Sequence, residues 1–286
     1  MNNEQGAQSQ DRAHTQIRTI ELNIDALGYA SASVLLSQGN TKVLVSVTLQ
    51  PGVPHFLKGQ QVGWLSAEYA MLPCATQQRT QREATAQQRN ARSVEISRLI
   101  GRCLRTCVDL SVLRERTIII DCDVLQADGG TRVACLTAAS IALEVAYKRW
   151  VAKGLVDKRL FKERIAAISA GRVDGKNCVD LSFEEDSVAH ADFNFVITES
   201  GMLVEVQGTA EKEPLAWEHF DELKMLAQDG VKQIFAACST LLQNNPAYQE
   251  LVRDESKAVR AENKPSENKK ESKAALFSLA NRITKS

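Results

Sequence analysis

Short extended segments open the chain and are separated by turn residues. Apolar residues alternate, or are β-branched, at positions 17–21, 31–36 and 42–49. Gly28 and the pair Gly39-Asn40 fall between these segments, and such residues favour tight turns. The pattern predicts a strand meander that begins near Ile17. A loop rich in proline and glycine follows, and residues 64–72 predict a further strand.

The hydrophobic period changes between residues 80 and 110. Apolar residues there recur every three or four positions, as in one buried helical stripe: Ile96, Leu99, Ile100, Cys103, Leu104, Cys107 and Val108. Residues 117–125 then form a nearly continuous β-branched run, which is typical of a strand covered on both faces. A turn at 128–131 ends this run, and a second helical pattern extends to about Trp150.

A second set of strands and helices follows. The predicted strands lie at 165–173, 177–182, 192–198 and 203–207, and the predicted helices at 217–228 and 231–243. Asp174-Gly175 and Ser200-Gly201 are turns of hairpin type. The order of elements predicts two related α+β halves, although no identity at a fixed period proves a repeat.

The two ends of the chain differ from this body. Residues 1–16 are rich in Asn, Gln and Ser, and we expect a disordered arm there. Beyond residue 246 the composition shifts to Lys, Glu, Asn and Ser, which predicts a charged, solvated tail over 246–286 with a short amphipathic turn at 274–283. The predicted organisation is one α+β domain over residues 17–245 between an arm and a tail.

The composition is that of an average soluble protein, with 44% hydrophobic and 24% charged residues, so no membrane partner is expected. The 35 basic and 35 acidic residues cancel, and a nucleic acid would therefore have to bind a local basic patch. The seven cysteines are an odd number among apolar neighbours, and residues 1–14 contain no signal-peptide core. We therefore expect a reducing, cytoplasmic location.

The residues after the β-branched strand could hold an anion. Gly129 and Gly130 stand at the mouth of a predicted helix, where backbone N–H groups and the helix dipole favour negative charge. Thr131 and Arg132 add a hydroxyl and a guanidinium. For Gly-Gly-Thr alone, an ordinary turn with Thr131 as the helix cap is a better explanation than an anion site. Arg132 favours the anion site, because a positive charge in the first turn of a helix opposes the dipole unless something compensates it. The arginines of the preceding helix could supply a second ligand or form a solvated face.

Acidic residues cluster at 180–187, and Asp192 follows Asp186 at the start of the next predicted strand. Two carboxylates on either side of a short loop can bind one divalent cation, and their hard oxygen atoms select Mg²⁺ or Mn²⁺. They could equally be charges that keep a loop soluble, and spacing alone favours that interpretation. The cysteines of the first helix lack zinc-site spacing, so we expect them to pack in the core.

Several runs of residues resemble bacterial ribonuclease PH. In chain order they are 52–54, 56–60, 67–69, 71–73, 119–132, 185–187 and 205–211. The resemblance extends from about Ile17 to Ser239 with almost no gaps. The stretches 121–132 and 205–211 are highly specific to that family.

The resemblance implies the ribonuclease PH fold, an α+β fold with two βαβα-like halves in one domain, and a ring of identical subunits, commonly a hexamer. It implies a tRNA nucleotidyltransferase, a phosphorolytic 3′→5′ exoribonuclease. Such an enzyme trims the 3′ ends of tRNA precursors with inorganic phosphate and releases nucleoside diphosphates. The alternative is a catalytically silent RNA-binding ring subunit of an RNA-degrading complex.

Site residues follow from the resemblance, position by position. The residues that match the family's phosphate site are Arg92, Gly130, Thr131 and Arg132. Asp186 and Asp192 match its catalytic and metal-binding aspartates, which would hold Mg²⁺ or Mn²⁺. The remaining candidates for RNA binding are Lys58, Arg79 and Arg82. Loss of phosphate or metal ligands would mark the silent alternative, and all of these ligands are present.

Some RNA-binding positions depart from the family pattern. His55 and Cys74 stand where the family usually has arginine, and its Arg-Pro-x-x-Arg opening is not found before Ile17. Each lost arginine removes a phosphate contact, so we expect weaker binding of structured RNA.

Overall fold

Alternating apolar residues build the first sheet of the computed structural model, which describes residues 12–83 and 90–262. Its strands are β1 (Ile20–Ile24), β2 (Ala32–Gln38), β3 (Thr41–Pro51), β4 (Trp64–Met71) and β5 (Arg116–Gln126), in the order β1-β2-β3-β5-β4. Only β4 and β5 pair in parallel, and helix α1 (Ala91–Thr106) connects them. One face of β3 is buried through Val43, Val45 and Val47, because successive side chains of a strand point to opposite faces.

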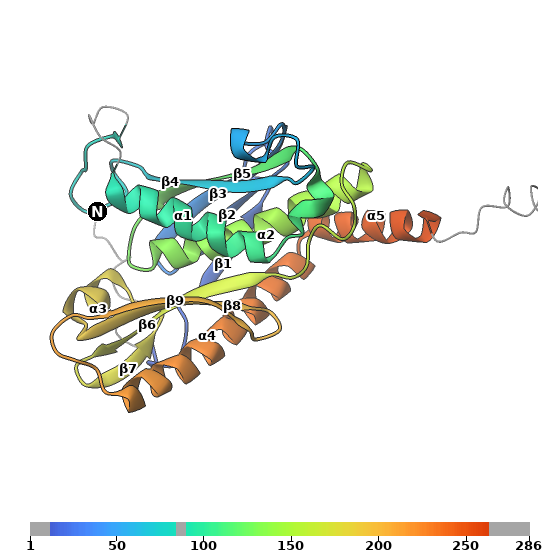
Figure 1. The fold of residues 1–286 in the computed structure, drawn as a ribbon. Helices are drawn as coiled ribbons and strands as arrows, with labels where there is room; N and C mark the ends of the chain where they lie inside the picture. Colours follow the sequence, from blue (N-terminus) through green and yellow to red (C-terminus); the bar gives the residue numbers. More distant parts are fainter. Residues whose placement is uncertain (1–11, 84–89, 263–286) are drawn as a thin grey trace, which may run out of the picture.

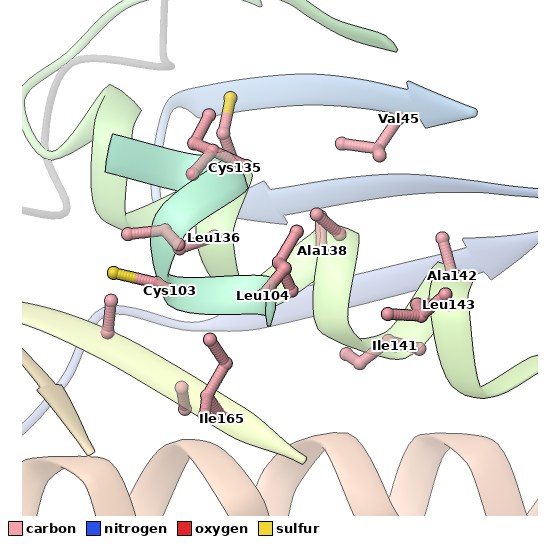
Figure 2. Packing of buried hydrophobic residues seen from close by; sticks show 14 of the residues in the cluster. Val45, Cys103, Leu104, Cys135, Leu136, Ala138, Ile141, Ala142, Leu143 and Ile165 are labelled. Carbon is pink, nitrogen blue, oxygen red and sulfur yellow. The ribbon is translucent and has the colours of Figure 1, made fainter. Parts of the chain in front are cut away.

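Two helices cover that buried face (Figure 1). Helix α1 buries the predicted stripe, and α2 (Thr131–Ala152) is buried on nearly all sides. Figure 2 shows the reason: α2 carries Ala138 between Val45 of the first sheet and Ile165 of the second. Helix α2 therefore forms the middle layer of the molecule, and its N-terminal end is held by both halves of the chain.

The second sheet has the order β7-β6-β8-β9 and is antiparallel throughout. Its elements are β6 (Ile165–Val173), β7 (Lys176–Val179), α3 (Phe183–Val188), β8 (Ala191–Thr198) and β9 (Leu203–Ala210), followed by α4 (Trp217–Gln243). Strand β6 is buried from Ile165 to Gly171, because it packs against both α2 and α4. Two short 3₁₀ helices, η2 (His55–Leu57) and η4 (Leu110–Leu113), lie in the loops of the first half.

Three predicted helices differ in extent from the structure. A single helix, α4, replaces the two predicted at 217–228 and 231–243. Gly230 lies inside this helix, where the absence of a Cβ lets α4 pack closely against Ile168 of β6. Helix α1 begins at Ala91, while the predicted helical pattern began near residue 80 and includes residues 84–89, which lie outside the described range.

The predicted tail was wrong for its first part, because helix α5 (Pro246–Glu262) follows α4 directly. Leu251 packs against the core, and the Tyr248 hydroxyl donates to Glu144 Oε1 at 2.7 Å. A few apolar side chains among many charges therefore dock this helix on α2. The predicted turn at 274–283 lies outside the described residues.

The predicted arm was also wrong for residues 12–16, which lie against the second half. The Val179 N–H donates to the carbonyl oxygen of His14 at 3.0 Å. The rest of the predicted arm, residues 1–11, lies outside the described range. In the described part of the chain, no helix combines the length and apolarity needed to cross a membrane.

Candidate active site

A cavity of about 1310 Å³ lies at the N-terminal end of α2, and both halves of the chain line it. Six of the predicted site residues line this cavity together: Arg92, Gly130, Thr131, Arg132, Asp186 and Asp192. They come from α1, the turn before α2, α3 and β8. Residues far apart in the sequence therefore meet at one surface.

The glycine turn leaves the start of α2 open to an anion. Gly129 and Gly130 have φ of 75° and 66°, a left-handed backbone that suits glycine. Gly130 is the N-cap, and no side chain in the described structure caps α2 there. The interpretation of Thr131 as the cap is therefore wrong, because Thr131 is the first residue of the helix. The first N–H groups of α2 stay available to a bound anion.

Tyr69 orients the hydroxyl of Thr131. The two side-chain oxygen atoms lie 3.0 Å apart in a buried contact. Burial raises the pKa of Tyr69 to about 12, so the phenol stays protonated and can donate to Thr131 Oγ1. The proton of the Thr131 hydroxyl is then free to be donated to an anion in the cavity.

Two arginines bring positive charge to the cavity from two helices. Arg132 Nη1 donates to Gln207 Oε1 at 3.2 Å and lies 3.9 Å from Glu95 Oε1. These contacts hold a side chain that the helix dipole disfavours. Arg92 stands at the start of α1, where the Asn90 side chain accepts from its N–H at 2.9 Å. The two guanidinium groups can share one phosphate-sized anion.

Helix α3 carries Asp186, where the sequence indicated a loop. A capping box starts this helix: Ser182 N–H donates to Glu185 Oε2 at 2.8 Å, and Glu185 N–H donates to Ser182 Oγ at 3.3 Å. The spacing of Ser182 and Glu185 is a sequence signal for such a box, and it could have found the helix. The capped helix fixes Asp186 opposite the glycine turn.

Asp186 and Asp192 both line the cavity; Asp186 is exposed at its surface and Asp192 is partly buried. Partial loss of water around the two carboxylates raises the pKa of both, and the negative charges of Asp186 and Glu211 raise that of Asp192 further. A cation beside them would relieve this repulsion. In the described ranges, no group of three or more His, Cys, Asp or Glu side chains forms a metal cage. Two carboxylates nevertheless fit Mg²⁺ or Mn²⁺, because Mg²⁺ usually keeps several waters.

The three predicted RNA-binding residues lie differently. Lys58 follows η2 before the start of β4, whereas the cavity lies at the Met71 end of that strand. Strand β4 has eight residues, about 25 Å at the usual rise, so Lys58 is remote from the cavity of its own chain. Arg79 lies between cavity-lining residues 78 and 80, and Arg82 is exposed just beyond it.

Comparison with known proteins identifies the family. Residues 16–147 match the family model for the 3′ exoribonuclease family, domain 1, and residues 163–230 match the model for its domain 2. The two matches cover more than two-thirds of the 286 residues. The chain therefore belongs to the 3′ exoribonuclease family, and the two halves of the fold correspond to its two domains.

Solved structures confirm the predicted α+β ribonuclease PH fold. Rice (Oryza sativa) Rrp46 is 18% identical, with a TM-score of 0.65 over 81% of this chain and 98% of that one. The Archaeoglobus fulgidus exosome with RNA bound to the active site contains a chain that is 23% identical, with a TM-score of 0.64 over 79% and 90%. A chain of an archaeal exosome core is 23% identical, with a TM-score of 0.61 over 78% and 87%. Membership of the bacterial ribonuclease PH branch stays a prediction.

Replacing Tyr69 with phenylalanine is expected to weaken phosphate binding about fivefold, because one neutral hydrogen bond contributes about 1 kcal/mol. The measurement is the KM for inorganic phosphate in an RNA degradation assay. Tyr147→Phe is the matched control, because it removes a 2.7 Å bond to the carbonyl oxygen of Lys158 at the other end of α2. Equal effects of the two variants would contradict the role of Tyr69.

Proposed function

We propose that the protein is a phosphorolytic 3′→5′ exoribonuclease that works as a subunit of an RNA-degrading ring. The observation that carries this proposal is the single cavity lined by Arg92, Thr131, Arg132, Asp186 and Asp192. Membership of the 3′ exoribonuclease family supports the reaction class. Likeness to exosome chains supports a ring subunit that degrades RNA more than it supports a specialised tRNA-trimming enzyme.

The cavity supplies what phosphorolysis needs. Arg92, Arg132 and the start of α2 would hold inorganic phosphate in line with the last phosphodiester of the RNA. An oxygen of this phosphate attacks the terminal phosphorus, and the bond to the 3′ oxygen of the preceding nucleotide breaks. A nucleoside diphosphate leaves, and the freed 3′ oxygen takes a proton. Positioning and neutralisation of charge dominate catalysis of such transfers.

Asp186 and Asp192 would serve the scissile phosphate. They would hold a Mg²⁺ or Mn²⁺ ion, which offsets negative charge on that phosphate when bound. The two arginines keep the inorganic phosphate apart from these carboxylates and screen the repulsion between them. A phosphoanhydride bond in the diphosphate replaces the broken phosphodiester bond with a small change in free energy, so the reverse reaction, extension of RNA from nucleoside diphosphates, is also expected.

Phe183 favours RNA as the substrate of this cavity. This apolar residue is 53% exposed, and it lines the cavity one helical turn before Asp186. An exposed aromatic ring beside a phosphate site can stack on a nucleotide base, whatever the base. Phe183 would then stack on the base of the 3′-terminal nucleotide, whichever base it is.

Replacing Phe183 with alanine is expected to raise the KM for RNA about tenfold, because stacking contributes about 1–3 kcal/mol per base. The KM for phosphate should stay near that of the wild type. Val188→Ala is the control, because Val188 is a 45% exposed apolar residue of the same helix that does not line the cavity. A wild-type RNA KM in Phe183→Ala would refute the stacking role.

The silent ring subunit is the second candidate, favoured by the likeness to exosome chains and by His55 and Cys74 at usual arginine positions. The test incubates the wild-type protein and Mg²⁺ with an unstructured RNA or with a tRNA carrying extra 3′ nucleotides, with and without phosphate. Phosphate-dependent loss of the unstructured RNA supports the main proposal. Loss of the tRNA extension alone supports the narrower tRNA-trimming activity. RNA binding without degradation supports the silent subunit.

A further inference from the structure

A buried ion pair lies directly behind the glycine turn of the cavity. Arg18 Nη2 and Asp180 Oδ1 are 2.7 Å apart, and the backbone N–H of Arg18 donates to Asp180 Oδ2, also at 2.7 Å. Asp180 is fully buried. Two bonds from one residue to one buried carboxylate fix the segment just before β1 to the second half, 162 residues away.

The same guanidinium holds the turn itself. Arg18 Nη1 donates to the carbonyl oxygen of Asp128 at 2.6 Å. On the other side, Asp128 Oδ1 accepts from the Phe183 N–H at 3.4 Å, and Gly129 packs on the backbone of residues 181–183. Arg18 and Asp180 therefore clamp the turn that precedes Thr131 onto the segment that starts α3.

Residues 12–18, which we name the strap, extend this clamp along the second half. Arg12 Nη2 bonds both oxygen atoms of Glu185, at 2.9 and 3.1 Å, and Glu185 belongs to the capping box of α3. Gln233 of α4 accepts from the Ile17 N–H and donates to the carbonyl oxygen of Thr15. The strap thus touches both walls of the cavity, although neither Arg12 nor Arg18 lines it.

We propose that Arg18 and Asp180 are positioning residues of the phosphate site. They set the separation between Thr131 and Arg132, which follow the clamped turn, and Asp186, which lies on α3. Arg18 itself does not line the cavity, and its two Nη groups bond to Asp128 and Asp180 behind the turn. This inference rests on the proposed phosphorolytic function. It adds the Arg18–Asp180 ion pair as the contact that fixes the two sides of that site relative to each other.

The chain offers a matched pair of variants. Asp180 and Asp25 both have a left-handed backbone, with φ of 55° and 64°, and each pairs with an arginine. Asparagine tolerates that backbone, so Asp→Asn removes the charge with little strain at either position. Asp25 pairs with Arg149 near the far end of α2, away from the cavity.

The test measures the KM for inorganic phosphate, the KM for RNA and the phosphate-induced rise in Tm of the full-length protein. Small misplacements at a reacting centre are costly, so Asp180→Asn should raise the phosphate KM about tenfold and reduce the Tm rise. The RNA KM should change less than the phosphate KM. Asp25→Asn should leave both KM values unchanged, even where it lowers the Tm without phosphate.

Three results would contradict the proposed positioning role of Arg18 and Asp180. A wild-type phosphate KM in Asp180→Asn would overturn it, as would an equal rise in Asp25→Asn. If Asp180→Asn does not fold, Arg18→Lys decides, because lysine keeps the charge but cannot hold both Asp128 and Asp180; a wild-type phosphate KM there overturns the inference. A wild-type protein that shows neither phosphate-dependent turnover nor a phosphate-induced Tm rise would instead refute the proposed function.

Discussion

Replacing Arg132 with alanine is expected to reduce phosphate-dependent degradation of RNA at least about 100-fold, as does loss of a preorganised charge-stabilising group in other enzymes. Arg132 brings a full positive charge to the first turn of α2, where the dipole alone would not favour it. The side chain is held by Gln207 and Glu95, so it is oriented before phosphate binds. The measurement is the rate of diphosphate release at saturating RNA over a range of phosphate concentrations.

Arg98→Ala is the matched control for Arg132→Ala. Arg98 is an exposed arginine of α1 that does not line the candidate active site. Its loss should leave turnover near the wild-type rate, and both variants should keep the wild-type assembly size. Full phosphate-dependent activity in Arg132→Ala would show that the phosphate site is assigned to the wrong residues.

Replacing Gly129 with alanine is expected to abolish activity and to destabilise the fold by several kcal/mol. The residue has φ of 75°, which costs a residue with a Cβ about 1–2 kcal/mol. An added Cβ would also lie 2.5 Å from the carbonyl oxygen of Leu181 and 2.8 Å from the Phe183 nitrogen. Because both atoms belong to the backbone, relief requires the two walls of the cavity to move apart.

Gly175→Ala separates these two costs. Gly175 has the same φ of 75°, but nothing lies within 4 Å of an added Cβ. Thermal denaturation should therefore show a loss of about 1–2 kcal/mol for Gly175→Ala, from backbone strain alone. Activity of that variant should stay near the wild-type level. Equal losses of stability in both variants would contradict the close approach at Gly129.

Local sequence patterns were sufficient to predict the helices and strands whose apolar residues form a regular buried face. The three- and four-residue spacing from Ile96 to Leu104 predicted α1, and the β-branched run after Thr117 predicted β5. Helix α5 could not be predicted in this way, because its stability depends on Tyr248 and Leu251 docking on a distant helix. Because charged residues dominate the composition of this segment, the sequence predicted a solvated tail there.

The same distinction between local sequence signals and tertiary packing applies to the residues of the candidate site. The Gly-Gly-Thr-Arg turn gave a local signal for an anion, and the resemblance to ribonuclease PH added Arg92, Asp186 and Asp192. Spacing along the chain could not show that Arg18 reaches Asp180, because only the packing of the two sheets brings them together. Nor could it place Lys58 at the opposite end of β4 from the cavity.

The most direct measurement incubates the wild-type protein and Mg²⁺ with unlabelled, unstructured RNA and radiolabelled inorganic phosphate. Because phosphorolysis transfers the attacking phosphate to the released nucleotide, we predict labelled nucleoside diphosphates that carry the label in the β-phosphate. Replacement of Arg132 by alanine should prevent this labelling. Release of unlabelled nucleoside monophosphates would show hydrolysis and would contradict a phosphorolytic site.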